Sequence, residues 1–139
     1  MLRLKDKLIF IVEDNPQNRV LFQMALVRHG AHLEFERWGQ ETVFRLQGFD
    51  KVHVILLDLM LANGVSGFEV CTQIRNAPKF ARVPIVAVSA MDPAVAMPKA
   101  RERDFSGFIA KPIAANRFAD QIVRIIQGEQ IWDVGEDTF

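Results

Sequence analysis

At 139 residues the chain is long enough for one domain with a sizeable core, and half of its residues are hydrophobic. Seventeen basic and seventeen acidic residues give a formal net charge of zero, which excludes the strongly basic surface typical of nucleic-acid-binding proteins. No apolar run approaches the roughly 20 residues of a membrane span, and the N-terminus lacks the apolar core of a signal peptide. The single cysteine, Cys71, fits a reducing compartment, so we expect a cytoplasmic protein without membrane insertion.

The first residues of the chain predict a strand followed by a helix. Residues 7–12 are an apolar run that ends on Glu13 and Asp14. Asn15-Pro16 is typical of a helix start, with asparagine as the cap and proline in the first turn, and Gly30 is typical of a helix end. Between these signals, apolar residues form a stripe at helical spacing: Val20, Leu21, Met24 and Val27.

The middle of the chain continues the alternation of strands and helices. The elements predicted there are an edge strand at 32–36, a short helix at 40–47, strands at 52–57 and 83–88, and a helix at 66–76. Residues 52–57 contain Val, Ile and Leu without polar alternation, which is typical of a strand buried on both faces. Ser66 followed three residues later by Glu69 is a capping box that opens the helix.

The last third of the chain contains a helix breaker and a final strand and helix. Pro98 inside a helix would lose a hydrogen bond and clash, at a cost of roughly 3 kcal/mol. We therefore expect a long loop from residue 91 and a short helix from about residue 98. A strand at 108–110 and a helix at 115–127 follow. We expect the domain to span residues 1–128, with a polar C-terminal tail at 129–139.

Five strands that alternate with five helices predict an α/β fold: a doubly wound, five-stranded parallel sheet with helices on both faces. In such a sheet the carboxyl ends of all strands lie at one edge, where ligands bind. Four of the strands end on reactive polar side chains, namely Asp14, Asp58, Ser89 and Lys111. Together with Glu13, the two aspartates would place three carboxylates at this edge, which predicts a metal site.

The arrangement of these residues resembles the receiver domain of bacterial two-component response regulators, in its stand-alone, single-domain form. The resemblance covers residues 7 to about 127 and rests on four motifs at successive strand ends: Glu13-Asp14, Asp58, Ser89-Ala90 and Lys111-Pro112. The intervals of 44, 31 and 22 residues between Asp14, Asp58, Ser89 and Lys111 fit the family. The resemblance implies the flavodoxin-like strand order 2-1-3-4-5.

The resemblance implies a role in phosphorelay signalling. Asp58 would accept a phosphoryl group from a phosphohistidine of a sensor histidine kinase or a histidine phosphotransfer protein. A carboxylate can act as the nucleophile, and the transfer depends chiefly on positioning and on neutralising charge. Lys111 and Ser89 would contact phosphate oxygens. The implied cofactor is Mg²⁺, held by the carboxylates of Glu13, Asp14 and Asp58 and by the backbone carbonyl of Met60.

The resemblance also implies how the domain would signal. The bond from Ser89 to the phosphate would draw the fourth strand inward, and Phe108 would turn into the space beside the small Ala90. The altered surface would bind a downstream protein, so we expect no enzymatic activity beyond self-catalysed aspartyl phosphorylation and dephosphorylation. We expect no nucleic acid as a partner, and homodimerisation stays open.

Departures from the family pattern leave alternatives open. Leu61-Ala62 stands where the family commonly has Met-Pro, and Gly67 comes one residue late, so the loop after Met60 has a different shape. Asp104 replaces the usual glycine after the fourth helix. The main alternative is a pseudo-receiver scaffold that signals without phosphorylation. A flavin- or nucleotide-binding domain is a third hypothesis, but the first strand is not followed by the glycine-rich phosphate loop that such a domain needs.

Overall fold

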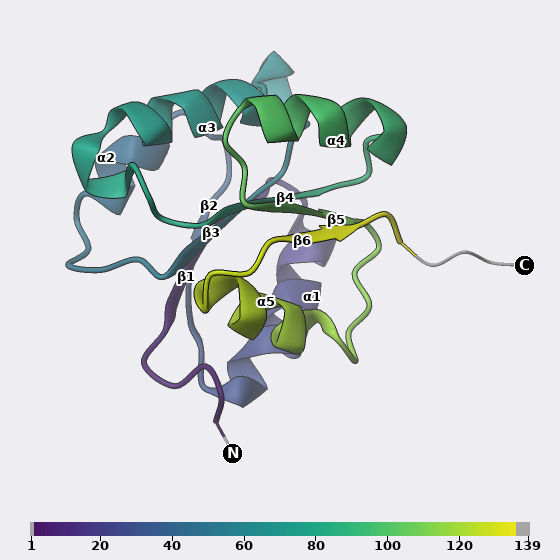
Figure 1. The fold of residues 1–139 in the computed structure, drawn as a ribbon. Coiled ribbons are helices and arrows are strands. Elements are labelled where there is room, and N and C mark those ends of the chain that lie inside the picture. The colour runs from purple at the N-terminus through teal and green to yellow at the C-terminus, as the bar shows by residue number, and fades with distance from the viewer. Residues whose placement is uncertain (1, 136–139) are drawn as a thin grey trace, which may run out of the picture.

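The computed structural model describes residues 2–135 and contains one six-stranded sheet with helices on both faces (Figure 1). The strands are β1 (Leu8–Val12), β2 (His32–Glu36), β3 (Val54–Leu57), β4 (Ile85–Ser89), β5 (Gly107–Ala110) and β6 (Ile131–Asp133). Their order is β2-β1-β3-β4-β5-β6, and all neighbouring pairs are parallel. The predicted fold and the order of the first five strands are confirmed, whereas β6 was not predicted.

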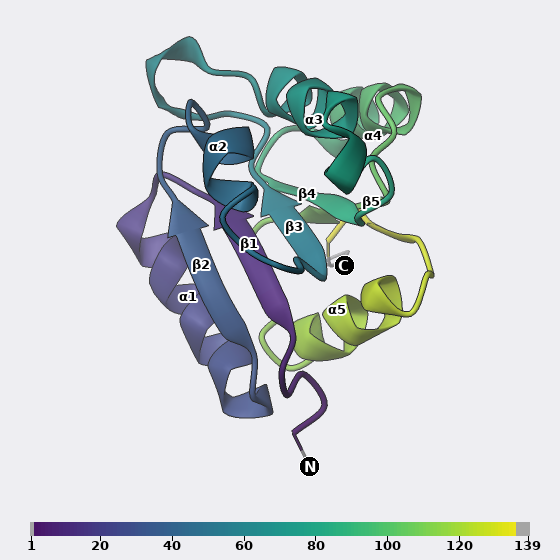
Figure 2. The ribbon, with the colours of Figure 1, turned by 90° about the vertical axis from the view of Figure 1, so that its left-hand side faces the viewer.

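Two layers of helices enclose the sheet, as Figures 1 and 2 show. One face is covered by α1 (Pro16–Leu26) and α5 (Phe118–Ile126), and the other by α2 (Thr42–Leu46), α3 (Gly67–Asn76) and α4 (Pro93–Glu102). Short 3₁₀ turns lie at Val27–His29, Ala62–Gly64 and Pro78–Phe80. Within residues 2–135, none of the helices has the length and apolar character that a membrane crossing requires.

The central strands supply two separate cores because successive side chains of a strand point to opposite faces. On β3, Ile55 and Leu57 pack with α2, α3 and α4, whereas Val54 and Leu56 pack with α1 and α5. Every residue of β3 and β4 is buried. The absence of polar alternation in these strands therefore predicted their burial on both faces correctly.

Helix α1 begins as predicted, but its apolar stripe faces solvent. The side-chain oxygen of Asn15 accepts hydrogen bonds from the backbone N–H groups of Gln17, at 2.8 Å, and Asn18, at 3.2 Å. Gly30, with a left-handed φ of 91°, ends the 3₁₀ turn that follows the helix. The residues that face the sheet are Phe22, Ala25 and Leu26, whereas Val20, Leu21, Met24 and Val27 are exposed. The helix has apolar residues on two sides, so their spacing alone did not identify which side of the helix is buried.

The expected loop before Pro98 and the short helix beginning there are wrong, because α4 runs unbroken through this residue. Asp92 caps the helix, since its Oδ1 accepts a hydrogen bond from the N–H of Ala94 at 3.0 Å. Pro98 has no N–H to donate to the Ala94 carbonyl. Both residues are exposed, so water can bind that carbonyl, while the buried face of α4 rests on Ala96 and Ala100.

The segment expected to be a polar tail from residue 129 adds β6 to the sheet. Ile131 is buried in the core beneath α5. The sheet therefore extends past residue 128, the expected end of the domain, and residues 136–139 of the expected tail lie outside the described residues. The register against β5 is Ile131 with Gly107, Trp132 with Phe108, and Asp133 with Ile109.

We expect the substitution Pro98→Ala to raise the free energy of unfolding by about 1–2 kcal/mol. Alanine restores the hydrogen bond to the Ala94 carbonyl and is a good helix former. Urea unfolding followed by circular dichroism measures the change. Pro93→Ala is the matched control, because proline in the first turn replaces no intrahelical donor, and it should leave stability unchanged or slightly lower. A Pro98→Ala protein less stable than the native chain would contradict the prediction.

Candidate functional site

The carboxyl ends of four strands bring the predicted site residues to one edge of the sheet. Glu13 and Asp14 follow β1, Asp58 follows β3, Ser89 ends β4, and Lys111 follows β5. The backbone ties these strand ends together. The N–H of Asp58 donates to the carbonyl of the last β1 residue at 3.1 Å, and the N–H of Lys111 donates to the Ser89 carbonyl at 2.9 Å.

Three carboxylates form the centre of this edge. Glu13, Asp14 and Asp58 each offer an oxygen, and these three oxygens lie within 4.8 Å of one another. Glu13 is 1% exposed and Asp58 is 7% exposed, whereas Asp14 is partly exposed. Burial raises the pKa of Glu13, although the positive charge of the adjacent Lys111 opposes this effect. Such a set of oxygen donors suits a hard divalent cation such as Mg²⁺.

Lys111 contacts two of the three carboxylates. Its Nζ donates a hydrogen bond to Asp58 Oδ2 at 2.8 Å and lies 2.6 Å from Glu13 Oε1, an ion pair rather than a well-aligned hydrogen bond. Burial alone would lower the pKa of Lys111, but the hydrogen bond to Asp58 and the negative charges of Asp58 and Glu13 outweigh this effect and raise it. The side chain is therefore a fixed positive charge. Sequence reasoning missed the pairing with Glu13, for which no local pattern gives a signal.

The loop after Asp58 keeps the carboxylate in place despite its unusual length. Asp58 Oδ1 accepts a hydrogen bond from the N–H of Met60 at 3.1 Å. Asn63, with a left-handed φ of 61°, lies in the 3₁₀ turn of this loop. A Cβ at Gly67 would lie only 2.1 Å from the Asp58 carbonyl oxygen, so glycine is required there. Sequence reasoning missed this role, and the displaced glycine was its only signal.

The remaining predicted residues surround the carboxylates. Ser89 Oγ accepts a hydrogen bond from the N–H of Met91 at 3.2 Å, which leaves the hydroxyl hydrogen for another acceptor. Phe108 is fully buried in the core beneath α4. Met60 is half exposed, and within residues 2–135 no hydrogen bond reaches its backbone carbonyl. That carbonyl is thus available as a further oxygen ligand beside Asp58.

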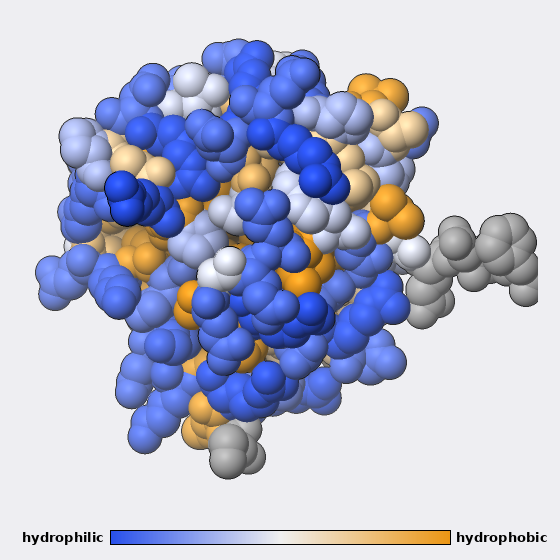
Figure 3. Space-filling view, viewed as in Figure 1, coloured by the Kyte–Doolittle hydropathy of each residue, from blue (hydrophilic) through white to orange (hydrophobic). Residues whose placement is uncertain are grey.

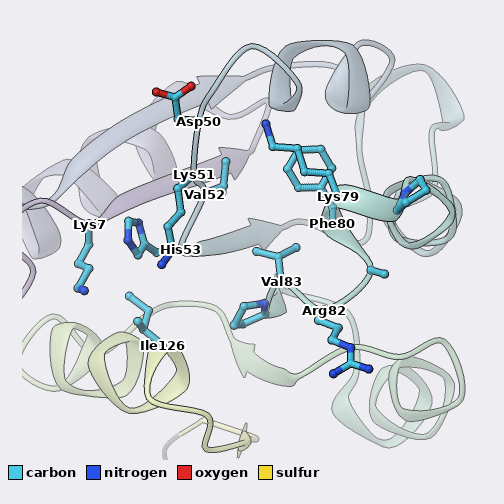
Figure 4. Close-up of a pocket in the computed structure, with 13 residues that line it drawn as sticks. Lys7, Asp50, Lys51, Val52, His53, Lys79, Phe80, Arg82, Val83 and Ile126 are labelled. Carbon is cyan, nitrogen blue, oxygen red and sulfur yellow. The ribbon is translucent and has the colours of Figure 1, made fainter.

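A hollow of about 630 Å³ lies at the opposite edge of the sheet (Figure 4). On its wall, Nδ1 of His53 accepts a hydrogen bond from the N–H of Leu8 at 3.0 Å. Burial and the nearby charges of Lys7 and Lys51 lower the pKa of His53, so the ring is a neutral structural group. None of the predicted site residues lines this hollow, which places it apart from the candidate site. Its basic residues are Lys7, Lys51, Lys79 and Arg82.

Comparison with known proteins gives consistent matches. Residues 9–123 match the response regulator receiver domain family. The chain is 30% identical to the polar-differentiation response regulator DivK of Brucella anthropi over 116 aligned residues. The alignment covers 84% of this chain and 93% of the relative.

Two solved structures have the same fold. The receiver domain of a sensor histidine kinase from Pseudomonas aeruginosa, with a magnesium ion coordinated in its active-site cleft, is similar at a TM-score of 0.77 and 24% identity, covering 88% of this chain and 98% of that one. The phosphorylated cyanobacterial phytochrome response regulator RcpA is similar at 0.69 and 27% identity, covering 88% and 89%. With the family match over most of its length, the chain belongs to the response regulator receiver domains of two-component signalling.

Proposed function

We propose that this receiver domain accepts a phosphoryl group on Asp58 from a phosphohistidine of a sensor histidine kinase or a histidine phosphotransfer protein. The observation that carries the proposal is the position of Asp58, buried at the end of β3 with one oxygen 2.8 Å from Lys111 Nζ and two further carboxylates beside it. An Asp58 oxygen forms the new bond to phosphorus while the bond from phosphorus to the histidine nitrogen breaks.

Mg²⁺ is the proposed cofactor, and the residues at the edge fit it. Three carboxylates face one ammonium group there, an excess of negative charge that a divalent cation offsets. When bound, the ion would neutralise charge on the transferring phosphoryl group. The magnesium ion in the Pseudomonas aeruginosa relative supports the assignment. The proposed ligands are the carboxylates of Glu13, Asp14 and Asp58 and the carbonyl of Met60.

Lys111 and Ser89 are the proposed partners of the phosphoryl oxygens. The ammonium group of Lys111 already donates a hydrogen bond to Asp58, so it would contact a phosphoryl group attached to that side chain. The Ser89 hydroxyl keeps a hydrogen to donate, since its oxygen accepts from Met91. We infer that donation from Ser89 would shift β4 and allow Phe108, now fully buried, to change its position.

The proposed output is phosphorylation-dependent binding to a downstream protein in the cytoplasm. The chain would act on no separate substrate, since its chemistry ends with phosphorylation and dephosphorylation of its own Asp58. The Asp58–Lys111 pair and the adjacent carboxylates favour this function over the pseudo-receiver scaffold, which would not need them.

Incubation with acetyl phosphate and Mg²⁺ should add one phosphoryl group to the chain, which intact-mass spectrometry detects. Removal of Mg²⁺ with EDTA should abolish the gain, because the carboxylates then repel the donor. Asp58→Asn, which retains the size of the side chain, should show no gain under any condition.

A phosphoryl gain that persists in Asp58→Asn would mean that another residue is the acceptor. No gain in the native chain, both with acetyl phosphate and with a phosphorylated histidine phosphotransfer protein as the donor, would support the scaffold instead.

Lys111→Met should lower the free energy of unfolding by about 3 kcal/mol without Mg²⁺, because it leaves two buried carboxylates without their cation. Mg²⁺ should restore part of the loss in the variant, and should stabilise it more than it stabilises the native chain. Urea unfolding with Mg²⁺ and with EDTA measures both effects. An equal free energy of unfolding for the variant and the native chain in EDTA would show that the ion pairs of Lys111 do not stabilise the fold.

A further inference from the structure

The hollow at the amino edge of the sheet has an excess of positive charge on its wall. It lies where the chain enters β1, β3 and β4, and its basic side chains are Lys7, Lys51, Lys79 and Arg82. Asp50 is the one acidic residue among the described residues that line it. Figure 4 shows the carboxylate of Asp50 directed away from Lys51 and His53. With a volume of about 630 Å³, the hollow has the size of a small-molecule site and favours an anion.

Three of the four cations have no anionic partner. Within residues 2–135, the side chains of Lys7, Lys51 and Arg82 form no ion pair and no hydrogen bond. Lys79 differs, because its Nζ donates a hydrogen bond to the Phe49 carbonyl at 2.6 Å. Cations that repel one another without a counterion make the binding of an anion between them favourable.

His53 adds a hydrogen-bond donor beside two of these lysines. Its Nδ1 accepts the hydrogen bond from Leu8, so the neutral ring carries its hydrogen on Nε2. None of the described residues accepts a hydrogen bond from this Nε2. Burial lowers the pKa of His53, and the charges of Lys7 and Lys51 lower it further, which places both ammonium groups near the ring. An anion there would accept from Nε2 and pair with both lysines.

The rest of the wall is largely apolar, and it includes Val52, Pro78, Val83, Pro84 and Ile126. In Figure 4, Val83 lies between His53 and Arg82. Figure 3 shows apolar surface at the left of the view, where the chain enters β3 and β4, with hydrophilic side chains around it. A ligand held by its anionic group at His53 would rest its body on this apolar surface. A planar ring suits the far end, because the guanidinium of Arg82 can stack on it.

We propose that this hollow binds a small soluble phosphate monoester with a planar ring, the chemical class of the mononucleotides. The phosphate would contact Lys7, Lys51 and Nε2 of His53, and the ring would lie on the apolar wall beside Arg82. Two ammonium groups match the two negative charges of a phosphate monoester, and the imidazole N–H supplies a further donor to its oxygens. The hollow lies at the edge of the sheet opposite the three carboxylates, so the proposal goes beyond phosphoryl transfer and does not depend on it.

Isothermal titration calorimetry of the full chain with AMP, GMP, CMP and UMP tests the proposal. EDTA is present throughout, so that no divalent cation recruits phosphate to the carboxylates at the other edge. At least one nucleotide should bind saturably, with one molecule per chain. Inorganic phosphate should bind about tenfold more weakly than that nucleotide, because it has no ring to bury on the apolar wall. The matching nucleoside, which has no phosphate, should show no detectable binding.

Single-charge variants locate the bound phosphate. Lys7→Gln and Lys51→Gln should each weaken nucleotide binding about tenfold, because each removes one charge-assisted hydrogen bond. Lys5→Gln is the matched control, since Lys5 is exposed and does not line the hollow, and it should leave the affinity unchanged. Nucleotide binding should shift the nuclear magnetic resonance signals of the His53 ring more than those of His29, which lies outside the hollow. Circular dichroism verifies that each variant is folded.

Several results would overturn the proposal. These are no saturable binding of any of the four nucleotides, equal affinity in the native chain and in Lys7→Gln/Lys51→Gln, or a nucleoside that binds as tightly as its nucleotide. An equal loss of affinity in Lys5→Gln and Lys51→Gln would show general attraction to positive charge rather than a site. Vesicles that contain phosphatidic acid present the same phosphate monoester on a lipid. Binding to these vesicles without binding to any soluble nucleotide would assign the basic residues to a membrane surface instead.

Discussion

Lys111 reaches from the end of β5 to one carboxylate that follows β1 and another that follows β3. Taking a carboxylate out of water costs several kcal/mol unless a partner charge is in place, and both Glu13 and Asp58 are buried. The ammonium group offsets this cost and fixes the relative positions of three strand ends. A cation or phosphoryl group that binds at this edge of the sheet therefore encounters existing ion pairs. Its binding must change the contacts between Lys111 and the two carboxylates.

The features of this protein that could be predicted are those encoded in short stretches of sequence. Apolar runs such as 52–57 have no polar alternation, so their burial in a parallel sheet follows from side-chain geometry. In a parallel sheet the strand ends share one edge, so the polar residues that follow the runs had to gather there. The cap at Asn15 and the turn at Gly30 are also local, since each satisfies backbone groups within a few residues. The composition of the candidate site was therefore predictable.

The features that could not be predicted depend on contacts between distant segments. The rule against proline inside a helix failed at Pro98, because the carbonyl left without a donor is exposed and α4 is anchored by buried alanines. β6 has only three residues, too few for a periodic signal, and it forms because β5 presents an open edge at Gly107. The need for glycine at 67 likewise arises from the Asp58 carbonyl, nine residues earlier in the chain.

The parallel arrangement of the strands also separates charge across the molecule. The carboxyl edge holds three carboxylates and one ammonium, whereas the hollow at the amino edge is lined by four basic side chains and one acidic one, Asp50. These two groups of charges form a dipole along the strands, although the formal charge of the chain sums to zero. A charged partner that comes within the screening length, about 10 Å at 0.1 M salt, would experience a torque with little net attraction. Electrostatics here would govern the orientation of an encounter more than its frequency.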